Sequence, residues 1–136
     1  MSEGPTGLWV GTDVVDLDRF RLALRRTPGM AARLFTEAER AYAQRKRDPA
    51  ERLAARFAVK EATMKALGVG LGAFRFHDVE VVRAPSGEPS LRLSGRAAML
   101  AQQRRITQWR VSISHSQLIA LAVVVAQGPG EGAGRG

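Results

Sequence analysis

Charged residues gather on one side of a predicted helix in the middle of the chain. Residues 50–67 contain no glycine or proline and many alanines, a composition that predicts a helix. At about 100° per residue, Glu61 and Lys65 lie between an apolar stripe and a stripe of alanines, while Lys60 projects among the large apolar residues. Arg56 flanks the same apolar stripe. This crowding indicates a site for a charged ligand; the alternative is an exposed i, i+4 pair of Glu61 with Lys65, worth about 0.2–0.5 kcal/mol.

An aspartate interrupts an otherwise apolar strand near the N-terminus. Residues 8–15 (LWVGTDVV) are rich in β-branched and apolar side chains, which predicts a strand. Asp13 lies inside this segment, on the same face as Val15 because side chains alternate along a strand. Two interpretations stay open at this point. Asp13 either bonds backbone amides near the end of the strand or serves as a metal ligand.

Together these two segments resemble the signatures of one family, the holo-acyl-carrier-protein synthases, which are the small trimeric class of 4′-phosphopantetheinyl transferases. The first signature is a G-[IVLT]-D segment, matched here by residues 11–13. The second is an F-[AS]-x-K-E-A-x-x-K-A helix, matched by residues 57–66. A later V-S-I-S-H-S segment at residues 111–116 also fits, and the resemblance covers residues 9–126.

The resemblance implies an activity and a metal ion. Members of the family transfer 4′-phosphopantetheine from coenzyme A to a serine hydroxyl of an apo acyl carrier protein and release 3′,5′-ADP. The family's magnesium ligands match Asp13 and Glu61, and magnesium prefers oxygen ligands and keeps several waters. Glu61 would also help take the serine proton, directly or through a metal-bound water. Lys65 would stabilise the departing phosphate.

The resemblance also implies how coenzyme A is held. Five residues match family positions near this co-substrate: Arg56, Lys60, Lys65, Gly68 and His115. The matched histidine comes from the neighbouring subunit of a homotrimer. For Lys60 a purely structural ion pair is the alternative, because an ammonium on an apolar face needs a partner. The family's G-K-P turn appears here as Gly87-Glu88-Pro89, so Glu88 replaces a cation.

Docking of the acidic, helical carrier protein is implied for the segment after Asp13. The residues concerned are Arg19, Arg26, Met30 and Arg33. The alternative is a solvated basic surface. The sequence does not distinguish fatty-acid carriers from polyketide carriers.

The charge of the chain leaves a second class of function to consider. Its 21 Lys and Arg residues against 13 Asp and Glu give a formal charge of +8, which attracts anions. A nucleic-acid-binding module is disfavoured, because no such motif is present and 6% aromatic residues leave little for base stacking. A carrier-binding relative without activity is disfavoured by the joint presence of Asp13, Glu61 and Lys65. No apolar run is long enough to cross a bilayer, so we expect no membrane partner and a cytoplasmic location.

The predicted class is α+β, with one domain at residues 8–126 in which a largely antiparallel sheet packs against a long helix. Helices are predicted at 17–26, from a capping box at Thr36, at 50–67 and at 95–105, and strands at 8–15, 79–82, 91–93, 109–114 and 118–125. Residues 1–7 and the glycine-rich residues 127–136 are expected to be disordered.

Overall fold

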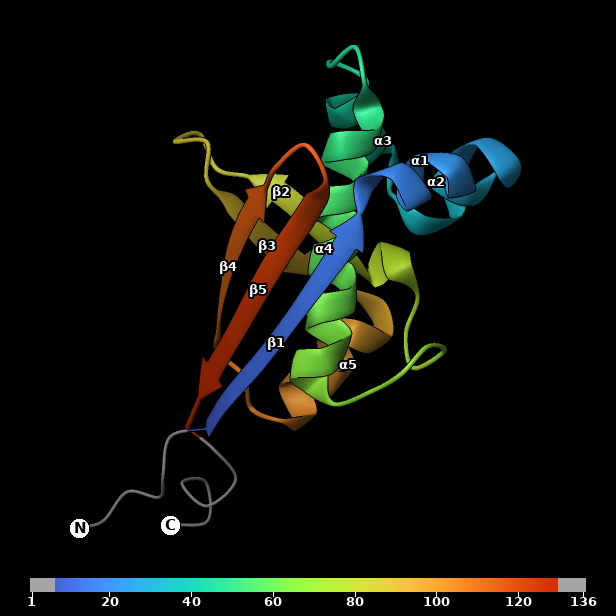
Figure 1. The fold of residues 1–136 in the computed structure, drawn as a ribbon. Coiled ribbons are helices and arrows are strands. Elements are labelled where there is room, and N and C mark those ends of the chain that lie inside the picture. The colour runs from blue at the N-terminus through green and yellow to red at the C-terminus, as the bar shows by residue number, and fades with distance from the viewer. Residues whose placement is uncertain (1–6, 130–136) are drawn as a thin grey trace, which may run out of the picture.

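A computed structural model describes residues 7–129 of the chain, which form an α+β domain (Figure 1). The elements, in chain order, are β1 (Gly7–Asp16), α1 (Leu17–Arg26), α2 (Met30–Leu34), α3 (Glu37–Ala43), α4 (Pro49–Leu67), the 3₁₀ turn η1 (Phe76–Asp78), β2 (Val79–Arg83), β3 (Pro89–Leu93), α5 (Gly95–Gln103), β4 (Gln108–His115) and β5 (Ile119–Gly128). Among these residues, no helix has the length and apolarity needed to cross a membrane.

The strands form two antiparallel sheets rather than one. The larger sheet has the order β1-β5-β4, so β1 and β4 are its two edges, and β2 pairs with β3 as a separate hairpin. Helix α4 lies along one face of the larger sheet, and the hairpin lies on the same side (Figure 1). The α+β class and the antiparallel pairing predicted from the sequence are therefore confirmed.

Small residues allow α4 to approach the sheet closely. Ala54, Ala58 and Ala62 form the alanine stripe of the predicted helix, and all three are fully buried. On β1, a Cβ atom added to Gly11 would lie 2.6 Å from the backbone nitrogen of Ala66 and closer still to the carbonyl of Ala62. Only glycine fits at this crossing, which brings the following residues of β1 against the middle of α4.

The ends of α4 follow the expected rules. Asp48 caps the first turn by accepting a hydrogen bond from the Ala50 amide, and Pro49 occupies a position where its missing N–H is not needed. Gly68 ends the helix in the left-handed region, with φ 70°. The predicted capping box of α3 is also present, since Thr36 and Glu39 bond each other's backbone amides.

Some predicted boundaries were wrong. The helix expected to reach residue 105 ends at Gln103, because Arg105 adopts φ 61°. Helix α2 and the turn η1 were not predicted.

The predicted disordered ends were also too long. Gly7 pairs with Gly128 in the sheet, and Gln127 is part of β5. A Cβ on Gly128 would overlap the carbonyl of Arg105, so this glycine serves close packing rather than disorder. The rest of both segments, residues 1–6 and 130–136, lies outside the described residues.

Candidate active site

Two carboxylates from distant parts of the chain meet beside α4. Asp13 lies on the inward face of the edge strand β1, and Glu61 lies on α4. Both line a cavity of about 330 Å³, together with Phe57 and Arg19. The pairing follows from the fold, because the Gly11 crossing places this part of β1 against the middle of α4. We call this the acidic cavity.

Lys65 forms an ion pair with one of the two carboxylates of the acidic cavity. Its Nζ lies 3.0 Å from Oδ1 of Asp13, across two elements. Among the described residues it makes no ion pair with Glu61, so the i, i+4 pair considered from the spacing is not formed. Burial, and then the negative charge of Asp13, raises the pKa of Glu61 above its ordinary value, while Lys65 opposes the shift. The cavity thus holds two carboxylates whose mutual repulsion one lysine does not cancel.

This donor set suits a magnesium ion. Among residues 7–129, no three His, Cys, Asp or Glu side chains lie close enough to form a metal centre alone. Magnesium is usually held by one or two carboxylates, with waters and substrate phosphates as its other ligands. A divalent cation would also offset the repulsion from Asp13, which adds to the effect of burial in raising the pKa of Glu61. Asp13 and Glu61 therefore fit the metal implied by the sequence.

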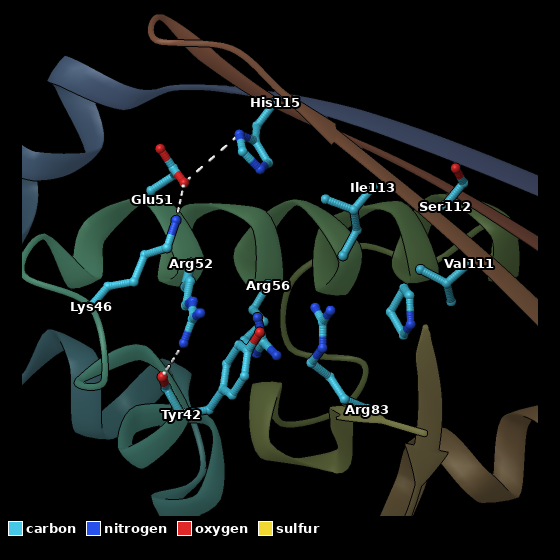
Figure 2. Close-up of a pocket in the computed structure, with 11 residues that line it drawn as sticks. Tyr42, Lys46, Glu51, Arg52, Arg56, Arg83, Val111, Ser112, Ile113 and His115 are labelled. Carbon is cyan, nitrogen blue, oxygen red and sulfur yellow. Dashed lines mark hydrogen bonds and ion pairs between the residues drawn. The ribbon is translucent and has the colours of Figure 1, made fainter. Parts of the chain in front are cut away.

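A second, larger cavity lies elsewhere on the molecule and is rich in cations (Figure 2). It has a volume of about 430 Å³ and is lined by Tyr42, Lys46, Glu51, Arg52, Arg56, Arg83, Pro89, Val111, Ser112, Ile113 and His115. We call this the basic cavity. Four of its lining residues are lysine or arginine and only one is acidic, so it is suited to an anionic ligand.

Glu51, the acidic residue of the basic cavity, contacts two side chains of the same cavity. Oε1 of Glu51 lies 3.0 Å from Nζ of Lys46 and 3.8 Å from Nδ1 of His115 (Figure 2). These contacts, with that to Lys46 largest, lower the pKa of Glu51. His115 reaches the cavity from the end of β4, and its side chain is about half exposed.

The two cavities face different directions. Asp13 belongs to β1 and His115 to β4, which are opposite edges of the larger sheet. On α4, Arg52 lies about 180° and Arg56 about 140° around the helix from Glu61. The acidic and basic cavities are consequently on opposite sides of α4 in one chain.

Known proteins match this arrangement along most of the chain. Residues 9–123 match the family described as the 4′-phosphopantetheinyl transferase superfamily. The chain belongs to this superfamily. The family named from the motifs is thus confirmed.

Individual relatives agree with this assignment. The holo-[acyl-carrier-protein] synthase of Frankia alni is 52% identical over 118 residues, which cover 87% of this chain and 95% of that protein. An ACPS–CoA complex from Chronobacterium ammoniagenes has a TM-score of 0.80 and 28% identity, covering 90% of this chain and 98% of the other. The Bacillus anthracis holo-(acyl-carrier-protein) synthase in complex with CoA (3′,5′-ADP) has a TM-score of 0.73 and 33% identity, covering 88% and 96%.

Lys60 of the superfamily signature does not reach either cavity. Its side chain is fully buried, and Nζ lies 2.9 Å from Oε1 of Glu39, whose side chain is equally buried. The ammonium also donates to the carbonyls of Phe76 and Val79, so its three hydrogens all have partners. In this structure Lys60 therefore forms the structural ion pair considered as the alternative from the sequence, and its ammonium is fully buried.

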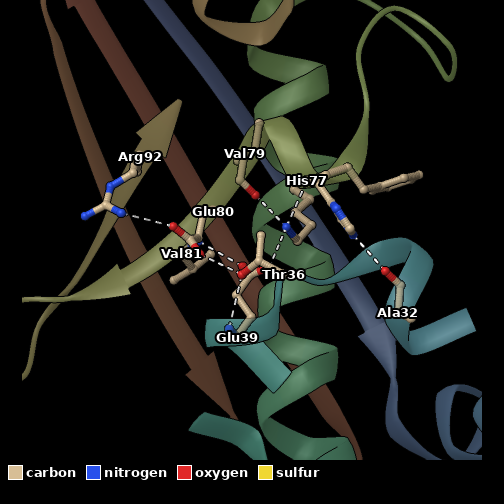
Figure 3. A network of polar contacts seen from close by, with 10 residues as sticks. Ala32, Thr36, Glu39, His77, Val79, Glu80, Val81 and Arg92 are labelled. Atoms are coloured by element: carbon tan, nitrogen blue, oxygen red, sulfur yellow. Dashed lines mark hydrogen bonds and ion pairs between the residues drawn. The ribbon is translucent and has the colours of Figure 1, made fainter. Parts of the chain in front are cut away.

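Glu39 connects this ion pair to the rest of the fold (Figure 3). Its second oxygen, Oε2, accepts from the amide of Val81, and Oε1 accepts from the amide of Thr36. The Thr36 hydroxyl donates to Glu80. The network ties α3, α4 and β2 together, which fixes the helix that carries Glu61.

The residues predicted to dock the carrier lie on α1 and α2. Arg19 and Arg26 differ by about 20° around α1 and are both exposed. The helix ends there, and Gly29, with φ 85°, precedes α2, which carries the half-buried Met30 and the exposed Arg33. The four residues thus occupy two helices rather than one continuous face, and Arg19 also borders the acidic cavity.

Gly68 serves the end of α4. Its amide donates to the carbonyl of Lys65, and nothing lies within 4 Å of the place where a Cβ would stand. Its φ of 70° rather than close packing accounts for the glycine.

Sequence reasoning missed several residues of the basic cavity. Tyr42, Arg52 and Arg83 come from α3, α4 and the end of β2. The signal available in the sequence was the i, i+4 spacing of Arg52 and Arg56, which puts two guanidinium groups on one face of α4.

Proposed function

We propose that the chain transfers 4′-phosphopantetheine from coenzyme A to a serine hydroxyl of an apo acyl carrier protein and releases 3′,5′-ADP. The observation that carries this proposal is that Asp13 and Glu61 line one cavity of a superfamily member, with Lys65 paired to Asp13. The direct test is intact-mass measurement of apo-carriers after incubation with coenzyme A and magnesium. The expected product carries one added phosphopantetheine, and unchanged mass for every carrier would refute the proposal.

Each side chain of the acidic site has its own role in the proposed reaction. Asp13 and Glu61 would hold magnesium, which supplies neutralisation of negative charge on the diphosphate of coenzyme A. The serine oxygen attacks the β-phosphorus, and the bond from that phosphorus to the oxygen bridging the diphosphate breaks. Glu61 receives the serine proton, directly or through water. Lys65 stabilises the phosphate that leaves with 3′,5′-ADP.

We further propose that a complete site forms between two chains of a homotrimer. The acidic and basic cavities lie on opposite edges of the sheet, so a ligand bridging both is best served by two copies. The outer face of the sheet supports assembly, since Leu8, Val10 and Val14 are each more than half exposed there. His115, in the basic cavity of one chain, would then contact a nucleotide whose diphosphate lies at the acidic cavity of the neighbouring chain.

Mixing two inactive variants tests the shared site. Glu61→Gln damages only the acidic cavity, and His115→Ala combined with Lys46→Ala damages only the basic cavity. In a trimer that contains both variants, a site with both halves intact forms at about one of the three interfaces, because each half comes from a different chain in a head-to-tail ring. Co-expression of the two, followed by purification of mixed assemblies, should restore about that share of transfer.

The matched control is co-expression of each variant with itself, which restores nothing. An absence of recovery in mixed trimers would mean that each site is built within one chain. Light scattering that finds an active monomer at assay concentration would also contradict the proposal.

Carrier docking is proposed for Arg19 and Arg26, which share one exposed side of α1. Arg19→Glu should raise KM for the carrier several-fold and leave KM for coenzyme A nearly unchanged, because rim charges act mainly on association. Added salt should mimic this substitution. Initial-rate kinetics with each substrate varied in turn provide the measurement.

Arg25→Glu is the matched control, since this exposed arginine lies on another side of α1, about 120° from Arg19. Equal increases of both KM values in Arg19→Glu would assign that arginine to the acidic cavity it borders, instead of to docking.

A further inference from the structure

Helix α1, which carries Arg19 and Arg26, extends with α2 to one side of the molecule (Figure 1). It packs on the core mainly through its first half, where Leu17 and Phe20 are buried, while Leu24 is only partly buried. A cavity of about 320 Å³ between α1 and the start of α4 is lined by Arg21, Leu24, Arg25, Ala31, Gln44, Asp48, Pro49, Ala50 and Leu53. Apolar packing therefore supports the second half of α1 less than the first.

An ion pair between two residues of this cavity joins α1 to the first turn of α4. Nε and Nη2 of Arg21 donate to Oδ2 of Asp48 at 3.0 and 2.7 Å, and Nη1 donates to Oδ1 of Asp18 at 3.1 Å. The other carboxylate oxygen of Asp48 caps α4 by accepting from the Ala50 amide. Three donor nitrogens on two carboxylates fix the geometry of the guanidinium more firmly than a single surface ion pair would.

Arg21 lies away from the proposed docking side of α1. At about 100° per residue, it is about 160° around the helix from Arg19 and about 140° from Arg26. Its hydrogen bonds go to Asp48 and Asp18, both within the chain. An effect of Arg21 on docking should therefore come from the position of α1 rather than from a contact with the carrier.

We propose that Arg21 and Asp48 are positioning residues, which set the orientation of the carrier-docking helix α1 relative to the helix that holds Glu61. The inference rests on the proposed function and deepens it by naming what aligns the docking surface with the acidic cavity. A carrier bound at Arg19 and Arg26 must at the same time present its serine hydroxyl at that cavity, which requires one orientation of α1. Ordering α1 only when the carrier binds would cost affinity, whereas the ion pair orders it beforehand.

Substitution of Asp48 distinguishes positioning from a direct electrostatic effect, because the two predict opposite signs. Asp48→Asn keeps a capping oxygen for the Ala50 amide and loses the charge that holds Arg21. If Asp48 only repelled the acidic carrier, this change would lower KM for the carrier. Positioning instead predicts that KM for the carrier rises by about 3- to 10-fold, as for loss of a partly exposed ion-pair network, while KM for coenzyme A is unchanged.

Arg21→Gln should raise KM for the carrier to a similar extent. The double variant Arg21→Gln/Asp48→Asn should be no worse than either single variant, because all three break the same contact. Arg21→Lys should recover part of the affinity, since it keeps the charge and loses the fork. Initial rates with each substrate varied in turn provide the measurement. Loss of folded protein has a different effect, which is a lower kcat with both KM values unchanged.

Arg25→Gln is the matched control. Arg25 is an exposed arginine on the same side of α1, about 40° from Arg21, and takes part in none of the ion pairs among residues 7–129. This variant should leave both KM values unchanged. A lower KM for the carrier in Asp48→Asn, additive increases in the double variant, or unchanged KM in both single variants would overturn the assignment. Failure of the proposed function differs from all of these, because the unmodified protein would then transfer nothing to any carrier.

Discussion

Replacing Asp13 with asparagine or Glu61 with glutamine is expected to lower transfer by about 10³-fold or more, because each removes an oxygen ligand from the cation that neutralises the diphosphate. Both side chains line the acidic cavity, and among the described residues no third acidic or histidine side chain groups with them closely enough to complete a metal centre. The measurement is single-turnover transfer to an apo-carrier over a range of magnesium concentrations. Near-normal turnover of either variant in limiting magnesium would contradict the metal assignment.

The stability of the Glu61 variant should change in the opposite direction to its activity. Burial and Asp13 raise the pKa of Glu61 in the folded state, so its contribution to stability is present at low pH and is lost as the pH rises through the raised value. Glu61→Gln should therefore raise the thermal unfolding midpoint at neutral pH without magnesium. Magnesium should stabilise the unmodified protein and not this variant, since a ligand stabilises only the form that binds it.

Glu51 provides a control of opposite sign. Its pKa is lowered, mainly by the hydrogen bond from Lys46, so its contribution to stability is present above its ordinary pKa and is lost as the pH falls. Glu51→Gln should lower the unfolding midpoint at neutral pH and leave the magnesium-induced increase intact. Unfolding curves recorded from acidic to neutral pH distinguish the two carboxylates.

The acidic cavity could be predicted from the sequence because its members stand in two short motifs. The helix signature contains Glu61 and Lys65, and the G-T-D segment contains Asp13. Their meeting depends on Gly11, whose missing side chain lets β1 cross α4 closely. Gly11 and Asp13 are two residues apart on the same face of β1, so this short segment contains both the close approach to α4 and the carboxylate that it positions.

The partner of Lys60 could not be predicted in the same way. The helical pattern indicated that its ammonium lies among apolar side chains, but Glu39 belongs to a different helix and was visible only as part of a capping box. Which carboxylate reaches a buried lysine depends on how two helices pack, and no local pattern encodes that. Lys60 consequently had two interpretations until the fold was known.

The basic cavity could not be predicted from the sequence, also because its residues come together only by packing. Tyr42, Arg52 and Arg83 lie on three elements and share no motif. An arginine-rich sequence offers many cations, and only packing distinguishes those that gather around one ring from those in solvent. Strand pairing was equally non-local, so the division into two sheets was not foreseen.

The ion pair between Lys65 and Asp13 raises the question of whether this lysine is structural or catalytic. The side chain of Lys65 is 58% exposed, and an exposed pair contributes only about 0–1 kcal/mol to stability. A metal ion held by Asp13 would compete with the ammonium for the same carboxylate oxygen. Lys65 would then be free to turn toward the phosphate oxygens of coenzyme A.

Lys65→Ala is accordingly expected to lower kcat by about 10²–10³-fold, the range for losing one electrostatic contact made in the transition state, with a much smaller change in unfolding midpoint. Lys65→Arg should keep part of the rate, because the charge remains while its position shifts. Arg92→Gln removes an exposed ion-paired cation elsewhere and should leave kcat unchanged. Steady-state kinetics with a saturating carrier measure the effect. An unchanged kcat in Lys65→Ala would mean that the contact with Asp13 is the whole role of this lysine.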